Sequence, residues 1–118
     1  INFGVIIILS IFMKLGFLGT GNITSDVVTG ICNSKLKFKQ IIISPRNKNK
    51  AKKLRRKFKK IVIAKNNQDV VDKSDWVFIG VLPKVAEKIL PNLKFKKSQI
   101  VVSFVATLSF SKLKNKIN

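Results

Sequence analysis

A glycine turn between two regular segments is the feature of this chain that most constrains its fold. Residues 15–18 form a short apolar run, Gly19-Thr20-Gly21 follows directly, and apolar side chains recur at helical spacing from Asn22 onward. Glycines at such a junction let backbone amides approach a ligand, and the first helical turn offers unpaired N–H groups and the positive end of the helix dipole. The arrangement predicts a strand–turn–helix unit that binds the pyrophosphate of a dinucleotide.

The remainder of the chain continues to alternate between apolar strand-like runs and helical patterns. The expected strands cover residues 14–18, 40–44, 61–64, 76–81 and 100–105. The expected helices cover residues 22–33, 47–59, 68–73, 83–90 and 109–117. Runs that are apolar throughout are typical of parallel strands buried on both faces. The pattern predicts an α/β fold, a Rossmann-like doubly wound parallel sheet of about five strands, ordered 3-2-1-4-5, with helices on both faces.

Three further positions refine the prediction for the glycine turn. Gly19 is expected to permit the sharp exit from the strand, and Gly21 to leave room for the pyrophosphate; the alternative is an ordinary tight turn. The third position of the pattern, usually Gly or Ala, is Thr24, whose branched side chain is expected to crowd strand and helix. Glycine inside a helix costs about 1 kcal/mol relative to alanine. We therefore expect Gly30, in the same helix, to allow close packing against a neighbouring element.

The end of the second strand bears on the choice of cofactor. Enzymes that use NAD commonly place an acidic residue there, where it binds the ribose 2′-hydroxyl. This chain has Ser44-Pro45-Arg46-Asn47 at that point and no acid nearby. Arg46 and Ser44, aided by Lys50, are expected to bind a 2′-phosphate instead, and a charge-assisted hydrogen bond contributes roughly 1.5–3 kcal/mol. The sequence therefore predicts NADP(H) in preference to NAD(H); the alternative is that Arg46 is one more surface cation.

Residue types that are scarce or missing exclude several chemistries. The chain has no histidine and a single cysteine, Cys32, which excludes a His-based triad, an internal disulfide and a multi-cysteine zinc site. We expect no metal and no catalytic side chain, and we expect Cys32 to fill the core. Any catalysis must therefore come from a bound cofactor. The cysteine usage is consistent with a reduced, cytoplasmic setting.

The charge of the chain is extreme, with 24 Lys and Arg residues against 5 Asp and Glu and a formal net charge of +19. One interpretation is a noncatalytic basic module that binds nucleic acid or an acidic surface. Most of the cations are lysines, however, and Tyr is absent, whereas nucleic-acid readers use arginine forks and interleaved aromatic side chains. We therefore expect no nucleic-acid partner and attribute the charge to a lysine-rich composition, with the basic module as an alternative.

The first residues differ in composition from the rest. Residues 1–12 are apolar, begin without Met, lack a basic segment, and are fewer than the ~20 that a membrane-spanning helix requires. We expect residues 1–12 to be a leader outside the fold and residues 13–118 to form a single NADP-binding Rossmann domain. No membrane partner is expected; a membrane anchor at the leader is the alternative.

A series of motifs extends along the chain. They are Gly16 to Ile23, Gly30, Ser44-Pro45-Arg46-Asn47 with Lys50-Ala51, Asn66 to Val71, Ser74 to Val77, Val81-Leu82-Pro83 and Val101 to Ala106. Together these motifs resemble the N-terminal domain of pyrroline-5-carboxylate reductase, an enzyme of proline biosynthesis. The resemblance covers residues 13–118.

The resemblance implies a role for each motif in holding the cofactor. It assigns the pyrophosphate to the helix start, the 2′-phosphate to the end of the second strand, the adenosine ribose to Asn67, and the nicotinamide to the fourth and fifth strands. Asp75 is expected to be structural rather than an acid catalyst. The predicted cofactor-binding residues are Gly19, Thr20, Gly21, Asn22, Ile23, Thr24, Ser44, Arg46, Asn47, Lys50, Asn67, Val81, Leu82, Pro83 and Ala106.

The family reduces the imine of 1-pyrroline-5-carboxylate with NAD(P)H, and its substrate site and dimer interface lie largely in a C-terminal helical domain. We expect that domain to be absent here, so that the chain alone binds NADPH, is largely inactive, and forms homo-oligomers only with the missing part. Leu82 and Thr107 replace the family's usual Lys and Gly beside the nicotinamide, which also lowers the expected turnover. Another NADP-dependent Rossmann reductase, of the hydroxyacid dehydrogenase type, is the alternative.

Overall fold

A computed structural model gives the structure of the chain and describes residues 12–104. Five parallel strands form one sheet in the order β3-β2-β1-β4-β5, which confirms the predicted fold class and strand order. The strands are β1 (Lys14–Leu18), β2 (Gln40–Ile43), β3 (Ile61–Ile63), β4 (Trp76–Ile79) and β5 (Ile100–Ser103).

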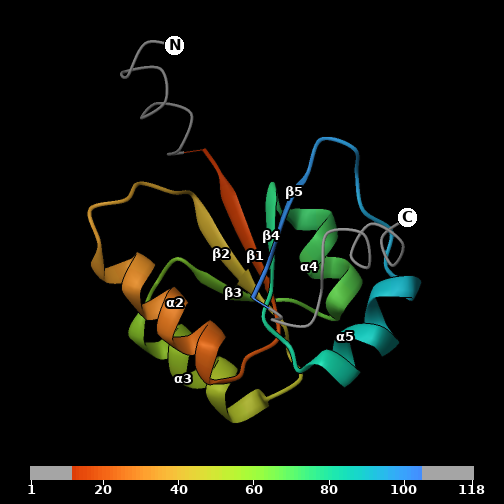
Figure 1. Ribbon diagram of the computed structural model, residues 1–118. Helices are drawn as coiled ribbons and strands as arrows, with labels where there is room; N and C mark the ends of the chain where they lie inside the picture. Colours follow the sequence, from red (N-terminus) through yellow and green to blue (C-terminus); the bar gives the residue numbers. More distant parts are fainter. Residues whose placement is uncertain (1–11, 105–118) are drawn as a thin grey trace.

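Helices connect the strands, as parallel neighbours require. They are α2 (Asn22–Asn33), α3 (Lys48–Lys57), α4 (Asn67–Lys73) and α5 (Pro83–Ile89), followed by the 3₁₀ turn η1 (Leu90–Asn92). Figure 1 shows α2 and α3 on one side of the sheet and α4 and α5 on the other. Residues 1–11 of the leader expected at 1–12, together with Ala106, Thr107 and the helix expected at 109–117, lie outside the described residues.

Several elements are shorter than the sequence predicted. The strand expected at 76–81 ends at Ile79, although the N–H of Gly80 still donates to the carbonyl of Leu18 at 2.9 Å. The helix expected at 47–59 begins one residue later because Asn47 is its N-cap, and its side chain accepts a hydrogen bond from the N–H of Lys50 at 3.2 Å. At its other end Phe58 is already extended, so the last turn stops at Lys57.

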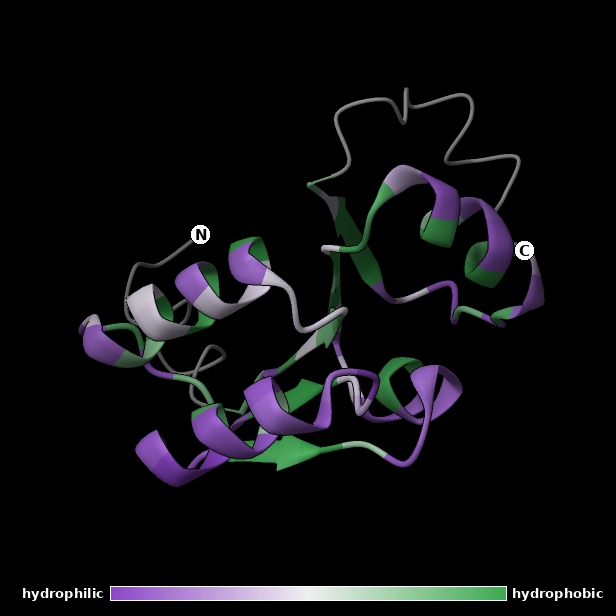
Figure 2. Cartoon of the chain, turned by 90° about the horizontal axis from the view of Figure 1, so that it is seen from below, coloured by the Kyte–Doolittle hydropathy of each residue, from purple (hydrophilic) through white to green (hydrophobic). Residues whose placement is uncertain are grey.

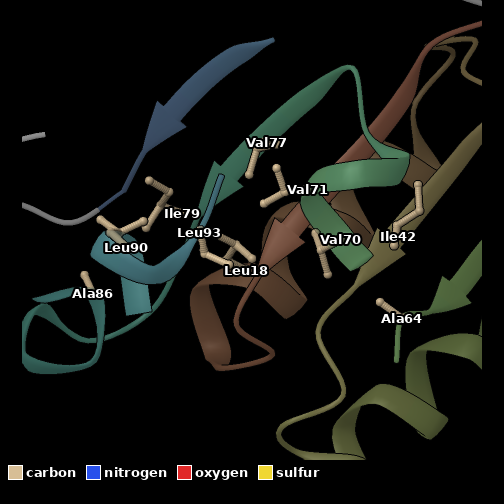
Figure 3. Close-up of a cluster of buried hydrophobic side chains, with 10 residues drawn as sticks. All are labelled: Leu18, Ile42, Ala64, Val70, Val71, Val77, Ile79, Ala86, Leu90 and Leu93. Atoms are coloured by element: carbon tan, nitrogen blue, oxygen red, sulfur yellow. The ribbon is translucent and has the colours of Figure 1, made fainter. Parts of the chain in front are cut away.

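The sheet is buried on both faces. Ile41 and Ile43 pack on the α2 and α3 side, while Ile42 between them packs against α4. Figure 2 shows hydrophobic residues along the strands and hydrophilic residues along the outer faces of the helices. The cluster on the α4 and α5 side consists of Leu18, Ile42, Ala64, Val70, Val71, Val77, Ile79, Ala86, Leu90 and Leu93 (Figure 3). Because both faces of the sheet are buried, its strands are continuous apolar runs, and such runs predict parallel strands.

Asp75 connects the starts of two neighbouring strands. Its Oδ2 accepts a hydrogen bond from the backbone N–H of Lys14 at 2.8 Å, and its own N–H donates to the carbonyl of Lys14 at 2.8 Å. These contacts lie at the beginnings of β1 and β4, the opposite edge of the sheet from the glycine turn. The structural role expected for Asp75 agrees with this placement.

Within residues 12–104, none of the helices combines the length and the apolar character needed to cross a membrane.

Candidate functional site

A cavity of about 930 Å³ opens at the carboxyl ends of the central strands. It lies where β1 has β2 on one side and β4 on the other, which is the point where the strand order reverses. Open α/β sheets bind ligands in this crevice. The lining residues are Gly19, Thr20, Gly21, Asn22, Ile23, Arg46, Asn47, Lys48, Asn49, Gly80, Val81, Leu82 and Val85.

Most of the predicted cofactor-binding residues meet at this cavity. Those that line it are Gly19, Thr20, Gly21, Asn22, Ile23, Arg46, Asn47, Val81 and Leu82. The predicted residues that do not line it are Thr24, Ser44, Lys50, Asn67 and Pro83, and Ala106 is outside the described residues. Their roles as ligands of a cofactor stay predictions, whereas their positions follow from the contacts described below.

Four lining residues were not predicted: Lys48, Asn49, Gly80 and Val85. Lys48 and Asn49 are the first two residues of α3, so they face the same opening as the predicted loop before them. Gly80 follows β4 directly, and Val85 lies in the first turn of α5. The Pro83 signal for a helix start could have identified Val85, because the beginnings of α2, α3 and α5 all border this crevice.

The glycine turn is built from close contacts between backbones. Gly19 has φ +101°, a conformation that disfavours any side chain, and a Cβ there would come within 2.6 Å of the carbonyl oxygen of Gly80. Gly21 is the N-cap of α2 and forms no side-chain cap hydrogen bond, so no side chain occupies the acceptor position at the helix start. An uncapped helix start that opens into a cavity suits an anion.

Thr24 is fully buried, and its Oγ1 has no hydrogen-bond partner among the described residues. A Cβ at Gly80 would overlap this oxygen. The crowding expected from Thr24 is therefore accommodated by Gly80, a glycine at the end of the facing strand.

The prediction for Gly30 was wrong: a Cβ there would meet nothing within 4 Å, so Gly30 does not mark a close approach.

Ser44 is buried, with 1% of its surface exposed. Its Oγ accepts a hydrogen bond from the N–H of Gly19 at 3.1 Å and donates one to Oδ1 of Asn67 at 2.8 Å. The two side chains predicted to bind the cofactor's ribose and 2′-phosphate are thus bonded to each other. They connect the turn after β1, the loop after β2 and the start of α4, the helix that follows β3.

The loop after β2 and the first turn of α3 carry the cations of the site. Arg46 and Lys48 line the cavity, and Nζ of Lys50 donates to Oδ1 of Asn22 at 2.9 Å, which joins the starts of α2 and α3. The N–H of Asn47 donates to Oγ1 of Thr20 at 3.3 Å. None of the lining residues in the described part of the chain is acidic. The opening therefore carries positive charge that favours an anionic ligand.

The acidic side chains and Cys32 do not gather into a metal site in the part of the chain that the structure describes. Across residues 12–104, no cluster of three or more His, Cys, Asp and Glu could hold a metal ion. Burial raises the pKa of the Cys32 thiol, and the charge of Lys60 lowers it in part. Cys32 packs against the cluster on the α2 and α3 side, in agreement with a role in the core.

Comparisons with known proteins agree with this geometry. Pyrroline-5-carboxylate reductase 3 of Danio rerio is 31% identical over 104 residues, which are 86% of this chain and 35% of that protein. The chain therefore spans about a third of the length of the curated relative that it matches. A solved 1-pyrroline-5-carboxylate reductase from Streptococcus pyogenes superposes with a TM-score of 0.74 at 28% identity, over 92% of this chain and 40% of that one.

More distant structures share the fold. A pyrroline-5-carboxylate reductase from Coxiella burnetii superposes with a TM-score of 0.79 at 18% identity, over 88% of this chain and 39% of that chain. A diketoreductase superposes with a TM-score of 0.69 at 15% identity, over 89% of this chain and 46% of that chain. A family model described as "NADP oxidoreductase coenzyme F420-dependent" matches residues 14–107, and the chain belongs to that family of oxidoreductases.

Proposed function

We propose that this chain binds NADP(H) at the carboxyl edge of its sheet and is the cofactor-binding part of a 1-pyrroline-5-carboxylate reductase. One observation carries the proposal: the uncapped start of α2 and the cationic residues before and within the first turn of α3 border a single cavity without a carboxylate. A dinucleotide phosphate needs both an anion site for its pyrophosphate and cations for its 2′-phosphate.

The binding mode follows from the positions of these groups. The N–H groups around Gly21, Asn22 and Ile23 would hold the pyrophosphate. Arg46 and Lys48 would hold the 2′-phosphate, with Lys50 adding positive charge from its bond to Asn22. The absence of an acid on this loop removes the repulsion that a carboxylate would exert on a 2′-phosphate.

The apolar edge of the cavity would receive the nicotinamide. Val81, Leu82 and Val85 lie there, and Leu82 is 74% exposed. Pro83 would set the direction of the chain into α5, and Ala106 stays a predicted neighbour. When bound, the cofactor supplies a hydride to the imine carbon of the substrate; the residues of this chain orient the ring and exclude water from one side of it.

The reaction itself needs more than the cavity provides. Among the described residues, Arg46 and Lys48 are the ionisable side chains that line the cavity, and no carboxyl group does; the chain corresponds to 35% of its curated relative. We propose that substrate binding and oligomerisation in proline biosynthesis depend on a further domain, and that the reaction takes place in the cytoplasm. The 118-residue chain alone is then expected to bind cofactor and to form proline barely or not at all.

A nucleotide titration tests the proposal. NADPH and NADH are titrated into the full chain at fixed ionic strength, with nicotinamide fluorescence and calorimetry as readouts. A single charge-assisted contact to the 2′-phosphate favours NADPH by roughly 10- to 150-fold, so the preference is expected to be at least of this order. ATP is a necessary control, because a chain of net charge +19 attracts any polyanion. Equal affinity for NADPH and NADH would contradict the proposed preference for NADP(H). If the chain binds neither nucleotide more tightly than ATP, the proposal that it binds a nicotinamide cofactor is wrong.

A further inference from the structure

The loop that carries Arg46 is held at both ends by hydroxyl groups. At its beginning, the hydroxyl of Ser44 accepts from the N–H of Gly19 at 3.1 Å, and the N–H of Ser44 donates to the carbonyl of Phe17 at 3.2 Å. At its end, the N–H of Asn47 donates to Oγ1 of Thr20 at 3.3 Å. Only two residues lie between these attachment points, and one of them is Pro45, whose ring fixes its φ.

Thr20 itself is poorly placed to be a side-chain ligand. It is 3% exposed, and its hydroxyl oxygen faces the backbone of Asn47. It nevertheless belongs to the glycine turn and lines the cavity, while its side chain accepts a hydrogen bond from the neighbouring loop. Thr20 thus joins the turn expected to bind pyrophosphate to the far end of the loop expected to bind the 2′-phosphate, beyond Arg46, while the bond between Gly19 and Ser44 joins them before it.

We propose that the Thr20 hydroxyl is a positioning group that sets the discrimination between NADP(H) and NAD(H) by fixing the backbone on which Arg46 stands. The inference rests on the proposed function. Both nucleotides need the glycine turn, but only NADP(H) needs Arg46 at a defined distance from that turn. Without the Thr20 bond, the loop that carries Arg46 has to become ordered when the 2′-phosphate binds. The entropic cost of this ordering weakens the binding of NADP(H) but not that of NAD(H).

The test compares two substitutions of Thr20 in the full 118-residue chain. Thr20→Val keeps the shape and removes the acceptor, and Thr20→Ser restores the acceptor. The expected result is that Thr20→Val lowers the ratio of NADPH to NADH affinity by about 3- to 10-fold, the range of one net hydrogen bond, and that Thr20→Ser restores the ratio. A general loss of stability would weaken the binding of both nucleotides equally and leave the ratio of their affinities unchanged.

A matched control is available at the other edge of the sheet. The hydroxyl of Ser34 also ties a loop, donating to the carbonyl of Ile31 at 2.7 Å and accepting from the N–H of Leu36 at 3.1 Å. Ser34→Ala is expected to keep the wild-type ratio. Thermal unfolding of each variant confirms that the ratio is measured on folded protein.

A double-mutant cycle with Arg46→Gln identifies the route of the effect. If Thr20 acts through Arg46, Thr20→Val causes no further change in the ratio once Arg46 is replaced. The inference is overturned if Thr20→Val leaves the ratio of NADPH to NADH affinity unchanged. It is also overturned if Thr20→Val changes this ratio equally in the wild-type and Arg46→Gln backgrounds. The proposed function stands in both cases. Failure of the wild-type chain to bind either nucleotide overturns the proposed function itself. If Thr20→Val does not fold, Thr20→Ala replaces it in the same cycle.

Discussion

The hydroxyl of Ser44 donates a 2.8 Å hydrogen bond to Oδ1 of Asn67, which stands 23 residues further along the chain. The same hydroxyl accepts from the N–H of Gly19, so a single buried oxygen connects the turn after β1, the loop after β2 and the start of α4. These segments lie at the carboxyl edge of the sheet, where the cavity opens. The edge is therefore held in shape by polar side chains before any ligand binds, which lowers the entropic cost of binding.

Ser44→Ala leaves the N–H of Gly19 and Oδ1 of Asn67 without this partner, and an unsatisfied buried group costs about 1–3 kcal/mol. We expect the free energy of unfolding to fall by this amount, measured in urea through the fluorescence of Trp76, the single tryptophan. Both nucleotides should bind more weakly, since the glycine turn serves both. A selective loss of NADPH would instead support the sequence-based prediction that Ser44 contacts the 2′-phosphate.

Arg46→Gln removes the cation that we assign to the 2′-phosphate, while keeping a polar side chain. NADPH affinity is expected to fall by roughly 10- to 150-fold, because a charge-assisted contact is lost, and NADH affinity is expected to stay the same. Calorimetric titration of both nucleotides at one salt concentration measures the two changes.

The control for this charge removal is Arg56→Gln, at an exposed position of α3 that does not line the cavity. It lowers the net charge of the chain by the same amount and is expected to leave the preference for NADPH intact. Equal losses of NADPH affinity in the two variants would show that the nucleotide senses only the overall charge.

The fold could be predicted from the sequence because each strand is short, apolar and buried on both sides. Ile41, Ile42 and Ile43 form a run that neither an amphipathic helix nor a half-exposed strand would contain. The strand order followed from the alternation with helices. The glycine turn and the loop that carries Arg46 could also be predicted, because a turn depends on residues that are adjacent in the sequence.

The rest of the site depends on contacts between residues distant in sequence. Nothing near Ser44 indicates that its hydroxyl meets Asn67, and nothing near Thr24 indicates that Gly80 gives it room. Nothing local distinguishes Lys48 from the other lysines of this helix, although it lies in the first turn of α3 and lines the cavity. Local patterns show the type of an element, while the pairing of its ends needs the folded sheet.

Gly19 and Gly30 are expected to respond to alanine in opposite ways. At Gly19, φ is +101° and the new Cβ would come within 2.6 Å of the carbonyl of Gly80, so Gly19→Ala should destabilise the chain by about 2 kcal/mol or more. At Gly30 the added methyl group meets open space in a helix, so Gly30→Ala should stabilise it by about 0.5–1 kcal/mol. The midpoints of urea unfolding measure both changes in stability. If Gly30→Ala destabilises the chain, Gly30 does pack closely against a neighbouring element, as the sequence predicted.

The start of α4 should make stability depend on pH through Asp69. A hydrogen bond from the N–H of Lys65 to Oδ2 of Asp69, 2.9 Å long, lowers the pKa of this carboxyl; partial burial opposes the effect and Lys73 adds to it. A carboxyl whose pKa is lower in the folded chain stabilises it fully above the unfolded pKa of about 4. This contribution is lost as the pH falls through the folded value. Asp69→Asn should therefore be less stable than wild type near neutrality, by an amount that shrinks below about pH 4.

Urea unfolding over a series of pH values measures this difference directly, and comparing the two chains cancels the charge repulsion that acid adds to both. Asp26→Asn, at an exposed position of α2, controls for the loss of one negative charge. Because Asn67 opens α4 and holds Ser44, loosening this helix start should also weaken the binding of both nucleotides. A stability difference between Asp69→Asn and wild type that stays constant down to acidic pH would contradict the role assigned to the carboxylate.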